Sequence, residues 1–208
     1  MKKVITLSSF FLVLLIYNGA PVHSEDGKDH IKAFFMSFAL PGLGQYYAGS
    51  TGNARIFIAS ELAILGGYYY NTVMKKAYRN DYLSHAALHA GVNPEGFGTS
   101  YLNALGSFNS SFEYNNYQQK ISYSPVIYTG DMIWNWETEE KRLRFKNLRE
   151  RELDYENYIK YCIAGIILNH FLSGLNAAKL VQNNNRANTA LRIDVLKCGL
   201  AVNYFRSF

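Results

Sequence analysis

The sequence predicts a mainly α-helical membrane protein, with a membrane helical hairpin, a long helix that ends in a third membrane segment, and a small C-terminal β-hairpin. Two apolar runs fill residues 31–70 on either side of a polar turn at Ser50–Asn53. A third apolar run covers residues 161–180. Each run is near the short end of the length that crosses a hydrocarbon core. Two later stretches, Leu191–Val195 and Leu200–Tyr204, alternate apolar and polar residues, which is typical of paired strands.

The composition agrees with a few membrane segments joined to a polar part. Of the 208 residues 49% are hydrophobic and 18% charged, and the mean hydropathy of -0.13 is too low for a many-span transporter. The net charge is +5, with basic and acidic residues interleaved along residues 137–156, so we expect no nucleic-acid partner. The 17 tyrosines suit a membrane interface, although an aromatic core would also use them. Cys162 and Cys198 make no disulfide framework or metal motif, and we expect no cofactor.

Residues 1–24 have the pattern of a secretory signal peptide. Lys2 and Lys3 form the charged start, Val4–Tyr17 is the apolar core, and Val22–Ser24 places small residues before a cleavage site. We expect cleavage after Ser24, so that the mature chain begins at Glu25. The alternative is an uncleaved anchor, and both interpretations place the protein in a bacterial cell envelope.

The mature chain is predicted to form one helical membrane domain over residues 25–182, followed by a tail at 183–208. The expected membrane segments are at about residues 32–48, 54–72 and 160–180, with a polar helical insert at 73–159. Inside and after the insert we expect helices at Asp81–Ala90, at Thr99–Lys120 and from Asp131 to about Gln182.

The first apolar run is interrupted in its middle. Pro41 has no backbone N–H and clashes with the preceding turn, and the carbonyl that it frees needs a partner in lipid. Gln45 can supply one, because its amide both donates and accepts hydrogen bonds. Gly42, Gly44 and Gly49 would let another helix approach closely. We therefore expect a kinked or re-entrant segment packed against the second run.

The stretch Pro41–Gly49, PGLGQYYAG, resembles the PGLGQ-[FY]-Y-x-G signature of a bacterial membrane-protein domain family of unknown function. Members carry a later W-x-W-E stretch, matched by Trp134–Glu137, then an arginine-rich helix, matched by Lys141–Arg151. Asn169–Ala177 is similar to their N-H-x-x-S-x-x-[DN]-A segment, with Asn176 where aspartate is expected, which weakens the idea of an essential charge there. The resemblance, over residues 31–75 and 130–182, implies a membrane location and no established enzymatic activity. The motif residues are Pro41, Gly42, Gly44, Gln45, Tyr47, Gly49, Trp134, Trp136, Asn169, His170, Ser173 and Asn176.

Glu61 is the one acid within the hairpin runs. A charge at membrane depth is costly and is usually functional or paired. We expect a polar cluster of Glu61 with Gln45, Asn169 and His170, because lone polar groups in apolar runs seek one another in lipid. The alternative is a protonated Glu61 that serves only as a packing contact between helices.

Two pairs in the insert have ordinary alternatives. His85 and His89 are four residues apart, hence on one helix face, and are weak candidates for metal ligands because no third ligand is evident. Structural histidines are the favoured interpretation. Trp134 and Trp136 would anchor at a membrane interface or pack in the core of the insert.

The sequence contains no catalytic constellation, and we expect a non-enzymatic envelope membrane protein that acts as a scaffold or assembly partner. Its expected partners are membrane lipid and other envelope proteins. One alternative is a small membrane enzyme or transporter component that uses Glu61 and His170. Another is an outer-membrane-associated protein, although the inner membrane is favoured.

The expected topology starts outside the cytoplasm at Glu25. It places the Ser50–Asn53 turn inside, residues 73–158 outside and the basic tail inside, as positive-inside placement of a short basic tail requires. A re-entrant first run would reverse everything after Pro41.

Overall fold

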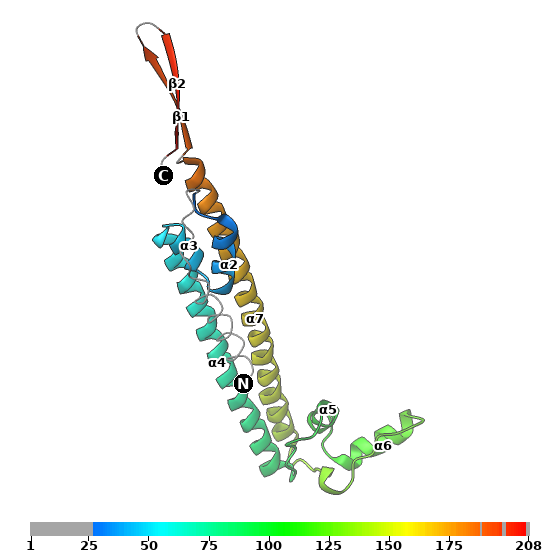
Figure 1. Cartoon of the computed structure of the whole chain (residues 1–208). Helices are drawn as coiled ribbons and strands as arrows, with labels where there is room; N and C mark the ends of the chain where they lie inside the picture. The colour runs from blue at the N-terminus through cyan, green and yellow to red at the C-terminus, as the bar shows by residue number, and fades with distance from the viewer. Residues whose placement is uncertain (1–26, 188, 197–198, 207–208) are drawn as a thin grey trace, which may run out of the picture. The chain divides into compact units, whose positions relative to one another are not determined.

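The structure is a computed structural model that describes residues 27–187, 189–196 and 199–206 (Figure 1). The predicted signal peptide lies outside these residues. The helices are α2 (His30–Ala39), α3 (Leu43–Tyr47), α4 (Thr51–His89), α5 (Thr99–Ser107), α6 (Ser111–Ile121), the 3-10 helix η1 (Gly130–Met132) and α7 (Glu139–Ala187). The strands are β1 (Thr189–Leu196) and β2 (Gly199–Arg206), antiparallel from Thr189 opposite Arg206 to Leu196 opposite Gly199. The prediction of a mainly α-helical chain is confirmed.

The chain divides into two compact units. Unit 1 takes residues up to Ile64 together with those from Ala164 onward, and unit 2 takes Leu65–Ile163. The two long helices α4 and α7 each contribute to both units. Each unit is described below by itself.

Three predicted helix boundaries in the insert are wrong. The predicted membrane helix at 54–72 and the helix at Asp81–Ala90 belong to one helix, α4. The stretch between residues 72 and 91 contains no glycine or proline, and the helix ends just before Gly91, whose φ is +70°. The helix predicted at Thr99–Lys120 is two helices. Ser110 starts the second, since its side chain accepts a hydrogen bond from the Glu113 amide.

The long helix begins at Glu139 rather than at Asp131. Residues 133–138 are extended instead, because their backbone groups have partners elsewhere in unit 2. The Asn135 amide donates to the Ala90 carbonyl, and the Trp136 amide donates to Asn109. Thr138 then caps α7, with its hydroxyl accepting from the Lys141 amide at 3.3 Å.

The break expected at Pro41 is present, and the first apolar run doubles back on itself. Gly42 has φ +98°, a conformation that favours glycine, and α2 and α3 flank it as helices of only ten and five residues. Ten helical residues extend about 15 Å, half of a hydrocarbon core. The two ends of the run lie close together, and Lys28 Nζ donates a hydrogen bond to the Tyr47 carbonyl at 2.7 Å.

One helix among the described residues is long and apolar enough, by length and composition, to cross a membrane. It is α7, and the apolar window that qualifies it has a mean hydropathy of 1.2. The third predicted membrane segment, residues 160–180, lies within this helix.

Unit 2 has an aromatic core of the kind found in water-soluble domains. Trp134, Trp136, Tyr82 and Phe145 are all at most 5% exposed. The two indole N–H groups are satisfied by backbone carbonyls of the α5 end: Trp134 donates to Phe108 at 3.1 Å and Trp136 to Leu105 at 2.8 Å. The interface-anchor interpretation of the two tryptophans is therefore wrong, and the core-packing alternative is correct.

Candidate functional site

Side chains of α7 provide hydrogen-bond partners for the backbone groups that the break at Pro41 leaves unpaired. In an unbroken helix the Phe38 carbonyl would accept from the Gly42 amide. Here the two groups are separated, and each finds a side chain on α7: His170 Nδ1 lies 2.6 Å from the Phe38 carbonyl oxygen, and the Gly42 amide donates to Ser173 Oγ at 3.1 Å. His170 and Ser173 are three residues apart, hence on one face of α7. The turn in the first run and this face of α7 therefore depend on each other.

Gln45, on α3, connects α2 with the same face of α7 through hydrogen bonds. Its side chain is fully buried; Oε1 accepts from Ser37 Oγ at 2.6 Å and Nε2 donates to the Ser173 carbonyl at 2.8 Å. A longer bond of 3.3 Å runs from Nε2 to Asn176 Oδ1. The PGLGQ stretch and the N-H-x-x-S-x-x-N stretch are thus two halves of one hydrogen-bonded structure.

Glu61 lies in a second polar group one helix away. Its Oε2 accepts from Asn169 Nδ2 at 2.8 Å, and its Oε1 lies 3.3 Å from His170 Nε2. Asn169 is held in turn by Ser60, whose hydroxyl donates to Oδ1 at 2.9 Å. The predicted contacts of Glu61 with Asn169 and His170 are present. The predicted contact with Gln45 is absent from the described bonds, because Gln45 is taken up by Ser37 and Ser173.

The contacts of His170 assign its tautomer. A carbonyl oxygen only accepts, so Nδ1, which faces Phe38, carries a hydrogen. Nε2 faces Glu61 Oε1, so the ring lies between a backbone carbonyl and the carboxyl group.

The pattern of buried and exposed side chains in unit 1 is the inverse of that in unit 2. The buried side chains of its described part are small or polar: Ala33, Ser37, Pro41, Gln45, Ala48, Ala54, Asn169, Ser173, Ala177 and Val181. The large apolar side chains are exposed instead: Ile31, Phe35, Phe38, Leu40, Ile56, Ile58, Leu62, Ile167, Leu168, Phe171, Leu172 and Leu175. No Leu, Ile or Phe is buried in the part of unit 1 that the structure describes.

Tyr47 and Gly49 complete the first motif at its outer end. The Tyr47 hydroxyl accepts from the Asp29 amide at 3.2 Å, and Lys28 and Lys32 lie 5.6 Å from the centre of its ring. Gly49 has φ +87°, which allows the turn into α4. Both residues therefore hold the closed end of the re-entrant run.

His85 and His89 lie together in unit 2, with ring centres 4.6 Å apart. His85 Nε2 lies 2.9 Å from the Lys141 carbonyl, and burial lowers the pKa of His85. His89 Nδ1 lies 2.9 Å from Glu137 Oε2. Each histidine therefore contacts a protein group, and no three His, Cys, Asp or Glu side chains gather as metal ligands among the described residues.

Sequence reasoning missed Ser37 and Ser60. Ser37 Oγ accepts from the Gly44 amide at 2.8 Å and donates to Gln45, while Ser60 orients Asn169. A usable signal was present, since each serine lies within an apolar run near a singled-out residue. Ser37 lies one helix turn before Pro41, and Ser60 is the direct neighbour of Glu61.

The comparisons with known proteins returned no match for this chain among family models, curated proteins or solved structures.

Proposed function

We propose that this chain is a non-enzymatic membrane protein of the bacterial cell envelope, in which unit 1 sits in the bilayer and unit 2 serves as a scaffold for assembly with other envelope proteins. The observation that carries this proposal is the inverted burial of unit 1. Helices in lipid associate through small residues and hydrogen-bonding side chains, because lipid removes the drive to bury large apolar groups. Twelve large apolar side chains exposed to water would instead favour aggregation.

Tyrosines mark where the bilayer would end. Tyr68, Tyr69 and Tyr70 on α4 and Tyr158 and Tyr161 on α7 are all more than a third exposed. Tyrosine favours the interface, where its ring is in lipid and its hydroxyl in water.

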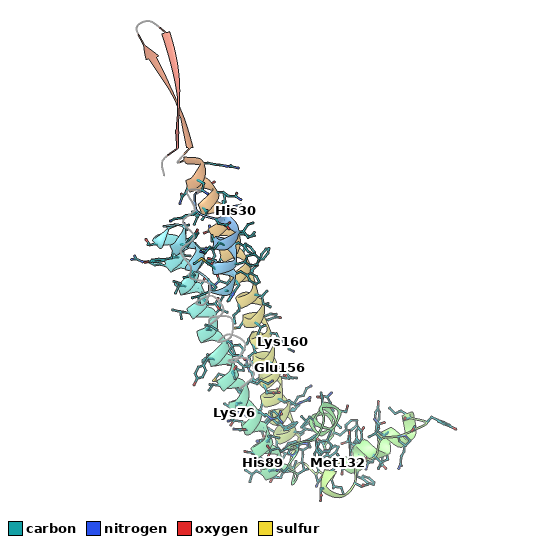
Figure 2. All side chains as sticks on the ribbon, in the orientation of Figure 1. His30, Lys76, His89, Met132, Glu156 and Lys160 are labelled. Carbon is teal, nitrogen blue, oxygen red and sulfur yellow. The ribbon has the colours of Figure 1, made fainter. Side chains whose placement is uncertain are left out.

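Charged groups follow the tyrosines directly. Lys75 Nζ bonds Glu156 Oε2 at 2.9 Å. Glu156 also pairs with Lys160, one turn along α7, at 3.1 Å; both residues are labelled in Figure 2. The hydrogen bond from Lys75 is the main cause that lowers the pKa of Glu156, so this carboxylate stays charged in water. The apolar stretch is thus bounded by groups that belong in water.

Exposed apolar side chains in unit 2 support the assembly role. Phe112 and Ile121 on α6 are 74% and 60% exposed, and Tyr123 just after the helix is fully exposed. Such side chains beside a well-packed core are typical of a protein-binding surface.

Site-specific photo-crosslinking tests the assembly role in native cells. A photoreactive residue at Tyr123 should give a discrete adduct, while the same residue at Asn147, an exposed position on α7, should give none. Phe112→Ser should weaken the Tyr123 adduct without changing retention of the protein in alkaline-washed membranes. Release of the wild-type chain by the alkaline wash would overturn the membrane placement, and identical adducts at both positions would overturn the scaffold.

A second candidate function is a proton-active component of a transporter or membrane enzyme. The contact between Glu61 and His170 favours it, because acid and histidine side chains within membranes commonly mark proton relays. Infrared difference spectra across a pH titration should then show a carbonyl or carboxylate band that disappears in Glu61→Gln. A phenotype in Glu61→Gln at normal protein level would support this function, and a silent variant would contradict it.

The third alternative, an outer-membrane-associated protein, would use the paired strands β1 and β2. Two strands cannot close a barrel. Membrane fractionation separates it from the inner-membrane placement that we propose.

A further inference from the structure

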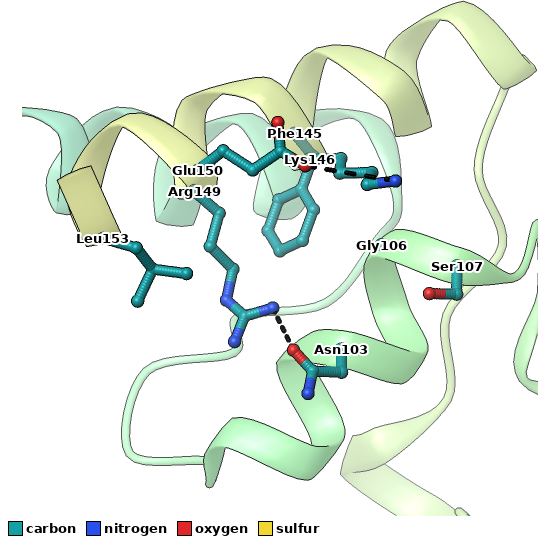
Figure 3. A pocket seen from close by; sticks show the side chains of 8 residues that line it. All are labelled: Asn103, Gly106, Ser107, Phe145, Lys146, Arg149, Glu150 and Leu153. Atoms are coloured by element: carbon teal, nitrogen blue, oxygen red, sulfur yellow. Dashed lines mark hydrogen bonds and ion pairs between the residues drawn. The ribbon is translucent and has the colours of Figure 1, made fainter.

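Unit 2 contains a small cavity between α5 and α7. It has a volume of about 200 Å³ and is lined by Asn103, Gly106, Ser107, Phe145, Lys146, Arg149, Glu150 and Leu153 (Figure 3). All eight residues belong to unit 2, so the cavity does not depend on how the units are placed. Its size is below the range of cavities for drug-sized ligands, and it suits a group of a few heavy atoms.

The lining combines an apolar wall with a cation. Phe145 is fully buried and Leu153 faces the same space from one helix turn beyond Arg149. Figure 3 shows the Arg149 guanidinium reaching toward Asn103, to whose Oδ1 it donates through Nη1. No hydrogen-bond partner for Nε or Nη2 is found in the described part of the chain. The planar donor fork of arginine therefore retains free positions at the cavity.

The net charge of the cavity lining favours a monoanion over a dianion. Arg149 has no carboxylate within ion-pair distance among the described residues. Burial lowers its pKa, and the charge of nearby Glu152, which is not part of the lining, acts against that shift. Lys146 lies 4.0 Å from Glu150, a loose pair that leaves the lining with one net positive charge. A monoanion compensates this charge, whereas a phosphate dianion would face the Glu150 carboxylate. The other polar groups, the Asn103 amide and the Ser107 hydroxyl, can both donate to an acceptor.

We propose that this cavity binds a carboxylate that carries a small branched apolar group, with the carboxylate on Arg149 and the apolar group against Phe145 and Leu153. Two sources supply this chemistry: a free short-chain acid, and the C-terminal residue of a protein chain. The guanidinium holds a carboxylate through two parallel N–H bonds, which gives both affinity and orientation.

Saturation-transfer NMR on the full-length protein in lipid nanodiscs tests the proposal, with empty nanodiscs as the blank. N-acetyl-leucine should bind at least about tenfold more tightly than N-acetyl-leucinamide, because only the acid makes charge-assisted bonds. Arg149→Gln should weaken binding of the acid by about tenfold or more. Arg151→Gln removes the same charge from an exposed position two residues away and should leave binding unchanged.

Other ligands separate the two sources. Isovalerate that binds as tightly as N-acetyl-leucine points to a free acid, and a leucine-terminated tripeptide that binds more tightly points to a chain terminus. Equal binding of acid and amide would overturn the site, as would displacement of N-acetyl-leucine by an equal concentration of inorganic phosphate. If Arg149→Gln does not fold, Ser107→Phe is the second variant, because a phenylalanine at this exposed position would fill part of the cavity. Unchanged binding of N-acetyl-leucine to Ser107→Phe would also overturn the proposal.

Discussion

Gly44 sets how closely α3 approaches its neighbours. A Cβ at this position would lie 2.0 Å from the Ala33 carbonyl oxygen on α2 and 2.8 Å from the Ala177 Cβ on α7. Neither group can move away, because one is backbone and the other is a side chain of a single carbon. The glycine is therefore required by contact on two sides, and its backbone needs no unusual φ.

Gly44→Ala should destabilise the protein by about 1–3 kcal/mol, the usual range for overpacking. Gly66→Ala is the matched control, since nothing lies within 4 Å of its added Cβ and alanine favours a helix. Thermal unfolding in detergent measures both. Equal melting temperatures for the two variants would show that α3 does not pack as described.

Glu61 gives a second prediction at this scale. Glu61→Gln keeps an acceptor for Asn169 and gains a donor toward His170, so we expect only a small loss of stability. Glu61→Lys places a cationic donor where Asn169 needs an acceptor, and should lower the amount of folded protein severely. Steady-state levels in membranes provide the measurement. If both variants are tolerated equally, Glu61 faces water.

Tyr101 makes unit 2 sensitive to alkali. Burial raises the pKa of Tyr101 from 10 to about 12, and its hydroxyl donates to the Met132 carbonyl at 3.0 Å. The folded state holds the proton more tightly, so this contribution to stability is complete below pH 10 and is lost as the pH rises through 12. Tyr101→Phe should cost about 1 kcal/mol at neutral pH through the lost hydrogen bond. Its unfolding free energy should then decline less than that of wild type above pH 10; a parallel decline would assign the sensitivity elsewhere.

At the scale of elements, α7 supplies the side chains that stabilise the break in the first run. Ser173 is the central one, because its hydroxyl receives the Gly42 amide and its carbonyl receives Gln45. Most of a turn's hydrogen bonds are usually local. Here the partners lie more than 120 residues apart in sequence.

Ser173→Ala should destabilise the protein by about 1–3 kcal/mol, because the Gly42 amide is then buried without its partner. Thr72→Ala is the control, since that hydroxyl is exposed and donates only to the Tyr68 carbonyl of its own helix. Chemical unfolding in mixed micelles compares the two. Similar losses in both variants would contradict the pairing of α7 with the turn.

The sequence predicts the parts of this arrangement that are local. Proline and glycine at 41 and 42 predict the break, and the isolated polar residues Glu61, Asn169 and His170 predict their own contacts, because each is conspicuous in an apolar run. Which of several similar polar groups a side chain will bond cannot be predicted from the local sequence. Gln45 could reach toward Glu61 or Ser37, and only the three-dimensional position of α3 decides for Ser37.

The insert is harder to predict because periodicity does not show where helices stop. Phe108 fits the apolar pattern of both α5 and α6, so the cap at Ser110 is hidden within it. The cavity beside Arg149 had no sequence signal at all. Its lining comes from two helices about forty residues apart, and the arginine lies in a run of mixed charges that reads as a solvated face.

At the scale of the whole molecule, the closed end of the first run bears on membrane topology. Lys28 bonds Tyr47, and Asn184 near the end of α7 donates to the Ala48 carbonyl at 2.9 Å. In the bilayer placement that we propose for unit 1, Lys28, the Ser50–Asn53 turn and the end of α7 therefore share one side. The topology expected for a spanning first run, with the chain start and this turn on opposite sides, does not fit these contacts.

A helix that crosses a bilayer carries its two ends to opposite faces. We therefore expect the Glu139 end of α7 to lie on the face opposite its Ala187 end. Cleavage after Ser24 would place the Ala187 end of α7 outside the cytoplasm and its Glu139 end inside.

Cysteine labelling in intact cells tests this topology, in a Cys162→Ser, Cys198→Ser background. His30→Cys and Thr51→Cys should react together with an impermeant maleimide, because both positions are exposed and lie at the closed end of the first run. Gln119→Cys, exposed on α6, should react only after the membrane is permeabilised. Opposite labelling of His30→Cys and Thr51→Cys would show that the first run spans. Labelling of all three positions in intact cells would contradict the proposal that unit 1 lies in the membrane.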